Sequence, residues 1–378
     1  MEDRKIRVGI THGDTNGAGY EQIFKIFADP EMLELCTPII YGSPKVAAYH
    51  RKALGMQANF SIVASTDEVE DGRVNLLTSF EEDVKVDLGE PTAESGAAAL
   101  KSLDRALTDL RDGAFDVLVC CPVCNENIHI DGRPFTGLKR YIEVSVGEGH
   151  EAVSLLLNDT LRIASATDAL AVKDVPGALT ADRLTARLNT LVESMRRDFR
   201  ISNPRVAVLQ LNPGGHGTEE KEAIVPAVAA ATGDGTHVFG PYAPEKYFGE
   251  GQFDAFDCTL ALYDDQARIP FSTLTADPGI YFLAGLPSVC LIPTGGAGFD
   301  TVGKGTSDES SLRRAIFVGI DIFRHREEYS APYADPLQKL YHERRDESEK
   351  VSFSIPKKRD AAQKKGQAKD HAPQSNEG

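Results

Sequence analysis

The sequence predicts an α/β fold, built either as two lobes or as one large unit. A chain of 378 residues, 41% of them hydrophobic, is long enough for either arrangement and can bury a core without disulfide bonds. Its first elements read as a strand, a glycine turn and a helix, which is the usual opening of a doubly wound α/β layer. The apolar run at residues 204–211 is typical of a strand that helices cover on both faces.

In the first half of the chain, short apolar or β-branched runs alternate with segments of helical spacing. The expected strands cover residues 6–10, 37–41 and 116–121. The expected helices cover residues 20–27, 44–54 and 94–112. A glycine turn at residues 13–19 joins the first strand to the first helix, and Pro122 ends the third strand.

The second half continues the alternation. Strands are expected at residues 161–166, 204–211, 258–263 and 285–293. Helices are expected at residues 150–157, 180–198 and 309–323, and the loop at residues 212–220 should open another helix. Beyond this core, residues 346–378 have almost no apolar content and a basic character, so a disordered basic tail is predicted after a folded region at residues 1–345.

The charge of the chain argues against two classes of partner. The formal net charge at pH 7 is −16, from 57 acidic and 41 basic side chains. Such a balance opposes binding to nucleic acid or to an anionic membrane. The N-terminus does not read as a signal peptide, and apolar runs fall short of the roughly 20 residues that span a bilayer. A cytoplasmic protein that binds neither nucleic acid nor membrane is therefore expected.

The six cysteines do not form the pattern of a secreted disulfide framework, since three of them crowd into Cys120, Cys121 and Cys124. The Cys121-x-x-Cys124 spacing is open to two interpretations. It could be a redox pair or half of a zinc site, but no second ligand pair with matching spacing is visible. The other interpretation is that these small side chains fill the end of a strand.

Several loop motifs occur together in one order along the chain. They are Gly13-Asp14 after the first strand, Pro122 at the end of a strand, Pro134-Phe135-Thr136-Gly137, Leu161-Arg162-Ile163-Ala164, Leu211-Asn212-Pro213, Gly217-Thr218-Glu219-Glu220, Tyr263-Asp264-Asp265-Gln266, Gly285-Leu286-Pro287 and Phe299-Asp300-Thr301-Val302-Gly303-Lys304-Gly305. This set resembles the 4-hydroxythreonine-4-phosphate dehydrogenase family of pyridoxal phosphate biosynthesis, over roughly residues 5–325.

The resemblance implies a homodimer of two-lobed α/β/α subunits, related in fold to isocitrate and isopropylmalate dehydrogenases. It also implies a central cleft, near residues 120–140 and 260–300, that holds NAD, a phosphorylated hydroxy amino acid and a divalent metal. The reaction of the family oxidises a secondary alcohol to a ketone, and decarboxylation follows. A metal acts as Lewis acid in such a reaction, and cationic side chains hold the phosphate.

The chain departs from the family pattern at the chemistry. Where the family has a His-Thr pair that contacts substrate, this chain has Leu138 and Lys139. The three metal histidines of the family fall on Ala169, Gly214 and Asp264. Two other hypotheses therefore stand beside the original activity. One is a dehydrogenase for another hydroxy acid, and the other is a non-catalytic relative that binds or regulates, for instance as a heterodimer with an intact homologue.

A different metal site is one hypothesis for these positions. Asp264, Asp168 and His216 are its candidate ligands, and clustered carboxylates suit Mg²⁺ or Mn²⁺ better than Zn²⁺. The alternative is that Asp264 is a solvated loop residue and that the neighbouring Asp265 makes a structural hydrogen bond.

The candidate catalytic residues are His12, Asp265 and Lys139. His12 follows the first strand, and its ordinary pKa near neutrality suits an acid or base, although a hydrogen-bonded turn histidine is the alternative. Lys139 and Arg140 would add positive charge where a small anionic substrate enters, or they are charges at the rim.

The candidate cofactor contacts are Asp300, Gly303, Lys304 and Gly305, by resemblance to the segment that meets NAD in the family. The alternative is that this segment is only a turn into the helix at residues 309–323. Ser307 or Asp308 would then cap that helix.

Overall fold

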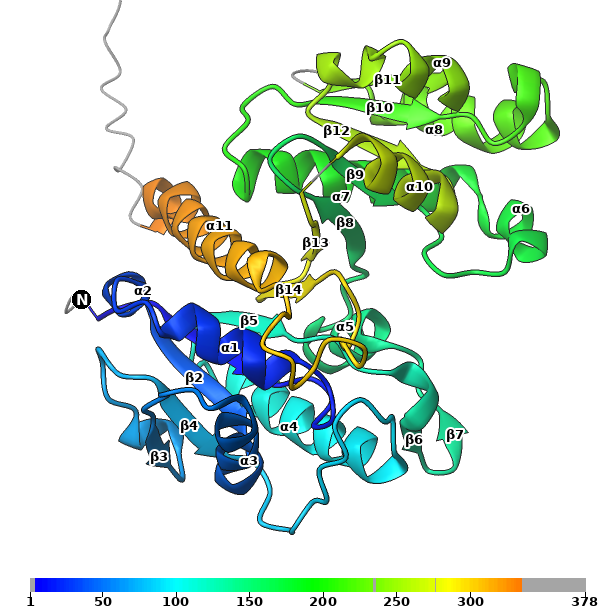
Figure 1. Ribbon diagram of the computed structural model, residues 1–378. Coiled ribbons are helices and arrows are strands. Elements are labelled where there is room, and N and C mark those ends of the chain that lie inside the picture. Colours follow the sequence, from blue (N-terminus) through cyan, green and yellow to red (C-terminus); the bar gives the residue numbers. More distant parts are fainter. Residues whose placement is uncertain (1–3, 234–235, 276, 335–378) are drawn as a thin grey trace, which may run out of the picture. The chain divides into compact units, whose positions relative to one another are not determined.

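A twelve-stranded mixed sheet runs through the computed structural model, which describes residues 4–233, 236–275 and 277–334 (Figure 1). Its strands are β1 (Arg7–Thr11), β2 (Thr37–Gly42), β3 (Ser61–Val63), β4 (Asn75–Thr78), β5 (Val117–Cys120), β8 (Val153–Leu157), β9 (Arg162–Ser165), β10 (Arg205–Leu209), β11 (His237–Tyr242), β12 (Cys258–Ala261), β13 (Ile280–Ala284) and β14 (Val289–Pro293). A separate two-stranded ribbon pairs β6 (His129–Ile130) with β7 (Arg133–Pro134).

The order of strands in the sheet is β11-β10-β12-β9-β8-β13-β14-β5-β1-β2-β4-β3. The strands from β14 to β3 are mutually parallel, and so are those from β11 to β9. Between these two groups, β8 pairs antiparallel with both β9 and β13, and β13 pairs antiparallel with β14. Two parallel half-sheets are thus joined through antiparallel strands. Each half-sheet has its own set of carboxyl strand ends, beside which a site can form.

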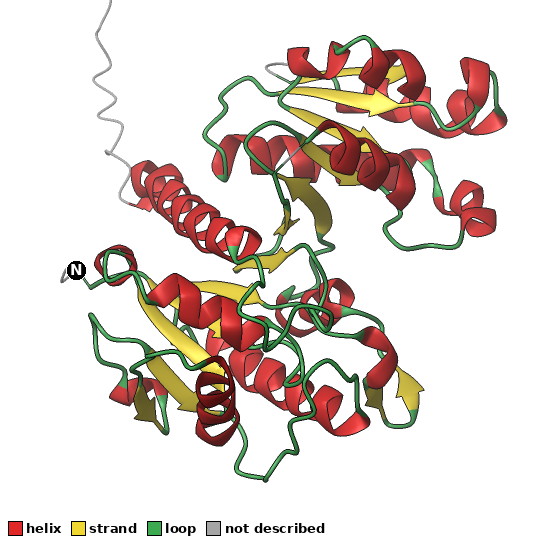
Figure 2. Cartoon of the chain, viewed as in Figure 1, coloured by secondary structure: helices red, strands yellow, loops and turns green. Residues whose placement is uncertain are grey.

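Helices occupy most of the connections between strands (Figure 2). They are α1 (Gly19–Phe27), α2 (Met32–Leu35), α3 (Pro44–Leu54), α4 (Ala93–Arg111), α5 (Leu138–Val146), α6 (Val175–Ala178), α7 (Ala181–Arg197), α8 (Val225–Ala231), α9 (Pro244–Gly249), α10 (Asp264–Leu274) and α11 (Ser310–Ala334). Short helical turns are η1 (Thr66–Glu68), η2 (Asn125–Asn127), η3 (Val172–Asp174), η4 (Pro213–Gly215), η5 (Glu220–Ile224, a π-helix) and η6 (Gln252–Ala255).

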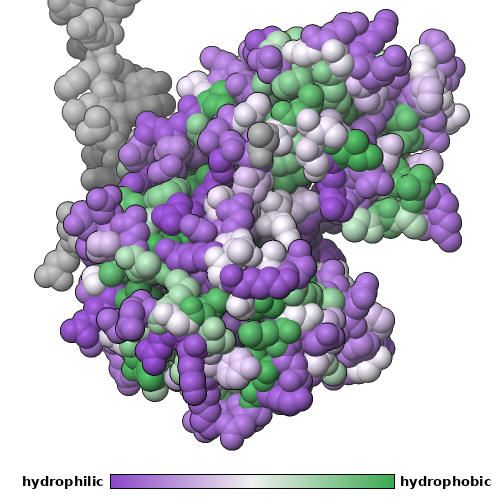
Figure 3. All heavy atoms as spheres, viewed as in Figure 1, coloured by the Kyte–Doolittle hydropathy of each residue, from purple (hydrophilic) through white to green (hydrophobic). Residues whose placement is uncertain are grey.

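Local sequence explains the best-formed elements. Every residue of β2, β5, β8, β12 and β14 is buried, which fits strands covered by helices on both faces. The nineteen-residue helix α4 begins with a capping box in which Thr92 and Ser95 each accept from the other's backbone N–H. Polar residues cover much of the face in Figure 3, as the high charge of the chain requires.

Most expected elements are confirmed, but two expectations for the second half were wrong. Residues 150–157 were expected to be helical, whereas residues Val153–Leu157 form the buried strand β8. No element is expected from the sequence at residues 264–274, and the structure shows that they form α10. The strand expected at residues 285–293 begins only at Val289, and the unexpected β13 precedes it. A short apolar run cannot be assigned to strand or helix from its period alone, which accounts for β8.

Two other expectations concern the ends and surface of the chain. No helix in the described part combines the length and the apolar character that crossing a membrane requires. The predicted disordered segment at residues 346–378 lies outside the described residues.

Candidate active site

The turn after β1 is fixed by the buried carboxylate of Asp14. Its Oδ1 accepts a hydrogen bond from the backbone N–H of Asn16 at 2.9 Å. Its Oδ2 accepts from Ser95 Oγ at 3.1 Å and from Asn127 Nδ2 at 2.8 Å. Because these donors belong to the turn, to α4 and to η2, one side chain holds three segments together. The glycines of this turn allow close packing, because a Cβ at Gly17 or Gly19 would lie within 2.4 Å of a backbone oxygen.

His12 lies in the protein interior at the end of β1, with none of its surface exposed. Its Nε2 is 2.8 Å from Ser102 Oγ, and its ring stacks on Tyr20 with centroids 4.9 Å apart. Burial, together with repulsion from His50, lowers the pKa of His12 to about 3, so the ring is neutral near pH 7. This placement is that of a hydrogen-bonded core histidine, the structural alternative to an acid or base.

A glycine segment, residues 294–305, follows β14 and leads to α11. Its glycines are Gly295, Gly296, Gly298, Gly303 and Gly305, and all have φ between +68° and +107°. A Cβ added at Gly295, Gly296 or Gly305 would meet no heavy atom within 4 Å. The backbone there is open to a ligand on the side where other residues carry a side chain.

This glycine segment is anchored on α1 by the buried carboxylate of Glu21. Glu21 Oε2 accepts from the N–H of Gly303 at 3.2 Å, and Oε1 accepts from the N–H of Ser307 at 2.9 Å. Lys25, one turn later on α1, forms an ion pair with the same carboxylate at 3.1 Å. The N–H of Ala18 adds a bond to the carbonyl of Ala297 at 2.8 Å. The first turn of α1 therefore sets the position of the segment.

Within the segment, the four predicted cofactor residues lie together. Asp300, Lys304 and Gly305 are exposed and Gly303 is half-buried, and Lys304 Nζ donates to the carbonyl of Asp300. The structural alternative is also present, because Asp308 Oδ1 accepts from the N–H of Ser310 at 2.9 Å at the start of α11. The hydrogen bonds from Ser310 lower the pKa of Asp308. The segment therefore both caps α11 and exposes its glycine backbone, so the two interpretations are compatible.

A second group of polar side chains surrounds Tyr281 on β13. Lys139 Nζ, in the first turn of α5, lies 3.7 Å from the centre of the Tyr281 ring and 3.4 Å from Asp168 Oδ1. On α10, Arg268 donates to Asp264 Oδ2 at 3.3 Å. Burial, reinforced by the charges of Asp264 and Asp168, raises the pKa of Tyr281 to about 12. The structure therefore brings the predicted residues Lys139, Asp168 and Asp264 to one place.

Strand topology explains why the two aspartates meet. Asp168 and Asp264 each stand three residues beyond the ends of β9 and β12, which are adjacent parallel strands. Ligands of open α/β sheets bind outside the carboxyl ends of such strands. Asp168 also has φ of +46°, a left-handed conformation that is uncommon outside glycine, and its N–H donates to Ser165 Oγ at 3.1 Å.

The remaining predicted residues, His216 and Asp265, are exposed. His216 follows η4 in a loop that the buried Glu220 holds, with Oε1 accepting from the N–H groups of Leu211 at 2.9 Å and Asn212 at 2.7 Å. Burial alone would raise the pKa of Glu220, but these bonds and that from the Asn212 side chain outweigh it and lower the pKa.

These positions do not fit a metal site. Across the described ranges, no three His, Cys, Asp or Glu side chains are gathered in an arrangement that holds a metal ion. Asp168 and Asp264 share the surroundings of Tyr281, but each has a cationic neighbour, Lys139 for the first and Arg268 for the second. The predicted donor set of Asp264, His216 and Asp168 is therefore not assembled in this structure.

The cysteines of the strand end are structural in character. Cys120 and Cys121 are fully buried, and burial raises the pKa of both thiols, that of Cys120 to about 12. Thiols held in this protonated form are poor nucleophiles and poor metal ligands. Cys124 is half-buried, and the interpretation that the side chains fill space is therefore favoured for Cys120 and Cys121.

Three polar residues near these positions were not predicted from the sequence. Arg268 lies four residues after Asp264, so recognition of α10 would have predicted the ion pair between them. Tyr281 belongs to β13, which was not expected. Glu220 was noted only as part of a motif, although a glutamate just after a turn rich in backbone donors is a signal for such anchoring.

Comparison with known proteins gives consistent matches. The family model for the pyridoxal phosphate biosynthetic protein PdxA matches residues 34–319. A 4-hydroxythreonine-4-phosphate dehydrogenase of Bacteroides thetaiotaomicron is 43% identical over 358 residues, which cover 93% of this chain and 98% of the relative.

Solved structures give the same result for the fold. A 4-hydroxythreonine-4-phosphate dehydrogenase from Burkholderia phymatum is 25% identical with a TM-score of 0.69, covering 85% of this chain and 99% of that chain. The enzyme of that name from Klebsiella pneumoniae is 23% identical with a TM-score of 0.72, at the same coverage of 85% and 99%. The expected two-lobed α/β/α fold is confirmed by these likenesses.

Proposed function

The chain belongs to the family of the pyridoxal phosphate biosynthetic protein PdxA, and from that premise we propose that it is an NAD-dependent dehydrogenase of a small anionic hydroxy acid. The substrate in the name of its relatives, 4-hydroxythreonine 4-phosphate, is the first compound to test. We further propose that the protein works as a homodimer in the cytoplasm.

The open glycine segment is the observation that carries this proposal. Three of its glycines leave space that a Cβ would occupy, so the backbone N–H groups can be approached closely by phosphate oxygens. These features fit a dinucleotide, for which Lys304 and Gly305 would be the contacts, while the N–H of Gly303 is already bonded to Glu21. NAD, when bound, supplies the acceptor for the hydride of the alcohol. Glu21 contributes by holding the segment in position through Gly303 and Ser307.

The cluster around Tyr281 supports an anionic substrate. The side chains of Lys139 and Asp168 are 30% and 34% exposed, so a ligand carboxylate or phosphate can replace Asp168 as the partner of Lys139. The hydroxyl of Tyr281 is protonated near neutral pH, as for any tyrosine, and burial raises its pKa further, so it can donate a hydrogen bond to the substrate. Lys139 is thus the proposed binding cation, and Tyr281 the proposed donor.

A second candidate is a non-catalytic member of the family that binds a ligand or a homologous subunit. The observation that favours it is that no metal site is assembled. The described residues do not gather ligands for the divalent metal that the family resemblance implies. No step of the proposed reaction is assigned to a metal for this reason. This candidate argues most strongly against activity on 4-hydroxythreonine 4-phosphate.

Calorimetric titration with NAD⁺ and NADH tests the proposal, because it requires no knowledge of the substrate. We expect one cofactor per chain for the wild-type protein and weaker binding for Glu21→Gln, since the variant loosens the glycine segment. Asp109→Asn is the matched control. It neutralises another buried, ion-paired carboxylate, which lies on α4 and accepts from Tyr41.

The results separate the two candidates. Binding with NADH formation from 4-hydroxythreonine 4-phosphate supports the proposed enzyme with the original substrate. Binding without turnover moves the search to other anionic hydroxy acids. If folded protein binds neither form of the cofactor, the dehydrogenase proposal fails, and the non-catalytic relative becomes the working description.

A further inference from the structure

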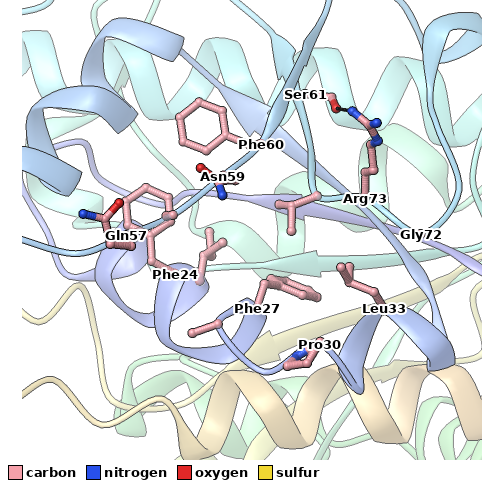
Figure 4. Close-up of a pocket in the computed structure, with 14 residues that line it drawn as sticks. Phe24, Phe27, Pro30, Leu33, Gln57, Asn59, Phe60, Ser61, Gly72 and Arg73 are labelled. Carbon is pink, nitrogen blue, oxygen red and sulfur yellow. Dashed lines mark hydrogen bonds between the residues drawn. The ribbon is translucent and has the colours of Figure 1, made fainter.

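A surface cavity of about 430 Å³ lies apart from the two groups of residues described above (Figure 4). One wall is the second half of α1 and the turn after it, and the other walls are residues 57–61, leading into β3, and residues 72–74, leading into β4. Its volume is within the range of about 300–1,000 Å³ that is usual for small-molecule sites. None of the predicted catalytic, cofactor or metal residues lines it.

Aromatic rings form the apolar part of this cavity. The rings of Phe24 and Phe60 are nearly parallel, with an angle of 10° between their planes and centroids 6.2 Å apart. Phe27 adds a third ring from α1, and Figure 4 shows it across the cavity from Phe60. Flat aromatic ligands are favoured on such walls, because stacked or edge-on rings gain more than area burial alone provides.

A single cation, Arg73, stands at the polar end of the described lining. Its Nη1 is 3.5 Å from Ser61 Oγ, as drawn in Figure 4, and its Nε is 3.0 Å from Glu70 Oε2. The side chains of Arg73 and Glu70 are 64% and 57% exposed, so solvent screens their ion pair and makes it weak. A ligand carboxylate can therefore take the guanidinium in a bidentate pair, with the hydroxyl of Ser61 as a further donor.

We propose that this cavity binds a small aromatic carboxylate. The aromatic ring packs against Phe24 and Phe60, and the carboxylate binds Arg73 and Ser61. The observation is independent of the proposed dehydrogenase function, because the glycine segment meets the first half of α1 and the cavity is lined by its second half. Failure of one proposal leaves the other standing.

The probe is 2-naphthoate, whose own fluorescence reports binding to the full chain, which contains no tryptophan. We expect one saturable site per chain. Arg73→Gln should weaken binding about tenfold, because one charge-assisted pair is lost, and Phe60→Leu should weaken it by removing the stacking surface. Arg111→Gln, at the exposed end of α4, is the matched control for charge and should bind like the wild type. Circular dichroism checks that each variant is folded.

Two ligand analogues test the ring contact and the carboxylate contact separately. Cyclohexanecarboxylate keeps the charge without the aromatic ring, and 2-naphthalenemethanol keeps the ring without the charge; both should bind more weakly than 2-naphthoate. The proposal is overturned if 2-naphthoate shows no saturable binding up to millimolar concentration. It is also overturned if folded Arg73→Gln and Phe60→Leu both bind as tightly as the wild type, because the ligand would then occupy another place.

Discussion

Buried carboxylates hold the loops of this protein in place at the scale of single residues. Asp14 gathers donors from three segments, and Glu21 holds the glycine segment on α1. A buried carboxylate is unfavourable unless its oxygens are satisfied, and both side chains meet that condition with hydrogen bonds. Loops that lie at strand ends and at a candidate cofactor segment therefore have fixed geometry without regular secondary structure.

Neutral His12 makes stability depend on pH. Its folded pKa of about 3 lies below the ordinary 6.5, so the unfolded chain binds more protons between these values. The folded state therefore loses stability as the pH falls from 6.5 toward 3, by up to about 1.4 kcal/mol per pH unit for this group. Urea unfolding of the wild type and of His12→Asn at pH 7, 6 and 5 measures the effect, and the variant should show the shallower dependence.

A matched control tests whether the pH dependence comes from the buried position of His12 or from the loss of any histidine. His150 is exposed, so His150→Asn should leave the pH dependence as in the wild type. Equal slopes for His12→Asn and the wild type would contradict the prediction. The buried His50, whose pKa is also lowered by burial, supplies part of the slope that remains in the His12 variant.

At the scale of elements, α7 and α11 are joined through one fully buried carboxylate. Asp198 directly follows α7, and its Oδ1 accepts from Arg197 Nε at 2.8 Å and from Arg326 Nε of α11 at 2.7 Å. Ser194 Oγ donates to Oδ2 at 2.7 Å. Burial opposes the charge, but the two arginines and their hydrogen bonds lower the pKa of Asp198 overall. Its ionised form is therefore the one that fastens α11 to α7.

Asp198→Asn should destabilise the protein by about 3 kcal/mol, because it leaves two guanidinium groups without their buried partner. The measurement is the free energy of unfolding in urea at pH 7. Asp182→Asn, in the exposed first turn of α7, removes the same charge from the same helix and should change stability by less than about 0.5 kcal/mol. A loss of similar size in both variants would mean that net charge, not the joint, governs stability.

Elements were predictable where the local pattern was strong. Helices α3, α4 and α7 were expected within a residue of their bounds, because each combines helical apolar spacing with a start signal. The strand β8 and the helix α10 were missed for different reasons. β8 is too short for its period to show, and α10 carries Pro270 and begins with two aspartates that suggested a loop.

The candidate site was predictable in part, where its residues follow strands that the sequence predicts. Asp168 and Asp264 each follow an expected strand, and because these two strands are parallel neighbours their loops meet. Lys139 was expected where an anionic substrate enters, and it lies beside Asp168. His216 was grouped with the two aspartates because it lies two residues after Gly214, the position of a metal histidine in the family, and only the structure shows that its loop is held by Glu220. The backbone N–H groups that Glu21 accepts from lie more than 280 residues away in the sequence, where no local pattern reaches.

At the scale of the whole molecule, the first half of the chain lacks part of its own sheet. β14 pairs with β5, and α11 contributes Leu312 and Ile316 to the same core cluster as Val8 and Val117. We expect a fragment of residues 1–150 to unfold without cooperativity, because β5 keeps an unpaired edge and the core is uncovered. Fusing residues 279–332 to this fragment through a flexible linker should restore a cooperative urea transition, followed by circular dichroism.

A fragment of residues 1–150 that unfolds as sharply as the fused chain would contradict this prediction. The matched control fuses residues 181–231 instead, a segment of similar length from the other half-sheet. It should not restore cooperativity, since β10 pairs with β11 and β12 and not with β5.

The position of β14 also has a consequence for biosynthesis. On the ribosome, β5 is complete at Cys120, while the strand that pairs with it begins only at Val289. At about 5–20 residues per second, the open edge waits on the order of ten seconds for its partner to be translated. During that interval the nascent chain presents a parallel, hydrophobic strand that is prone to aggregate. Translation products that stop before Val289 would keep this edge unpaired.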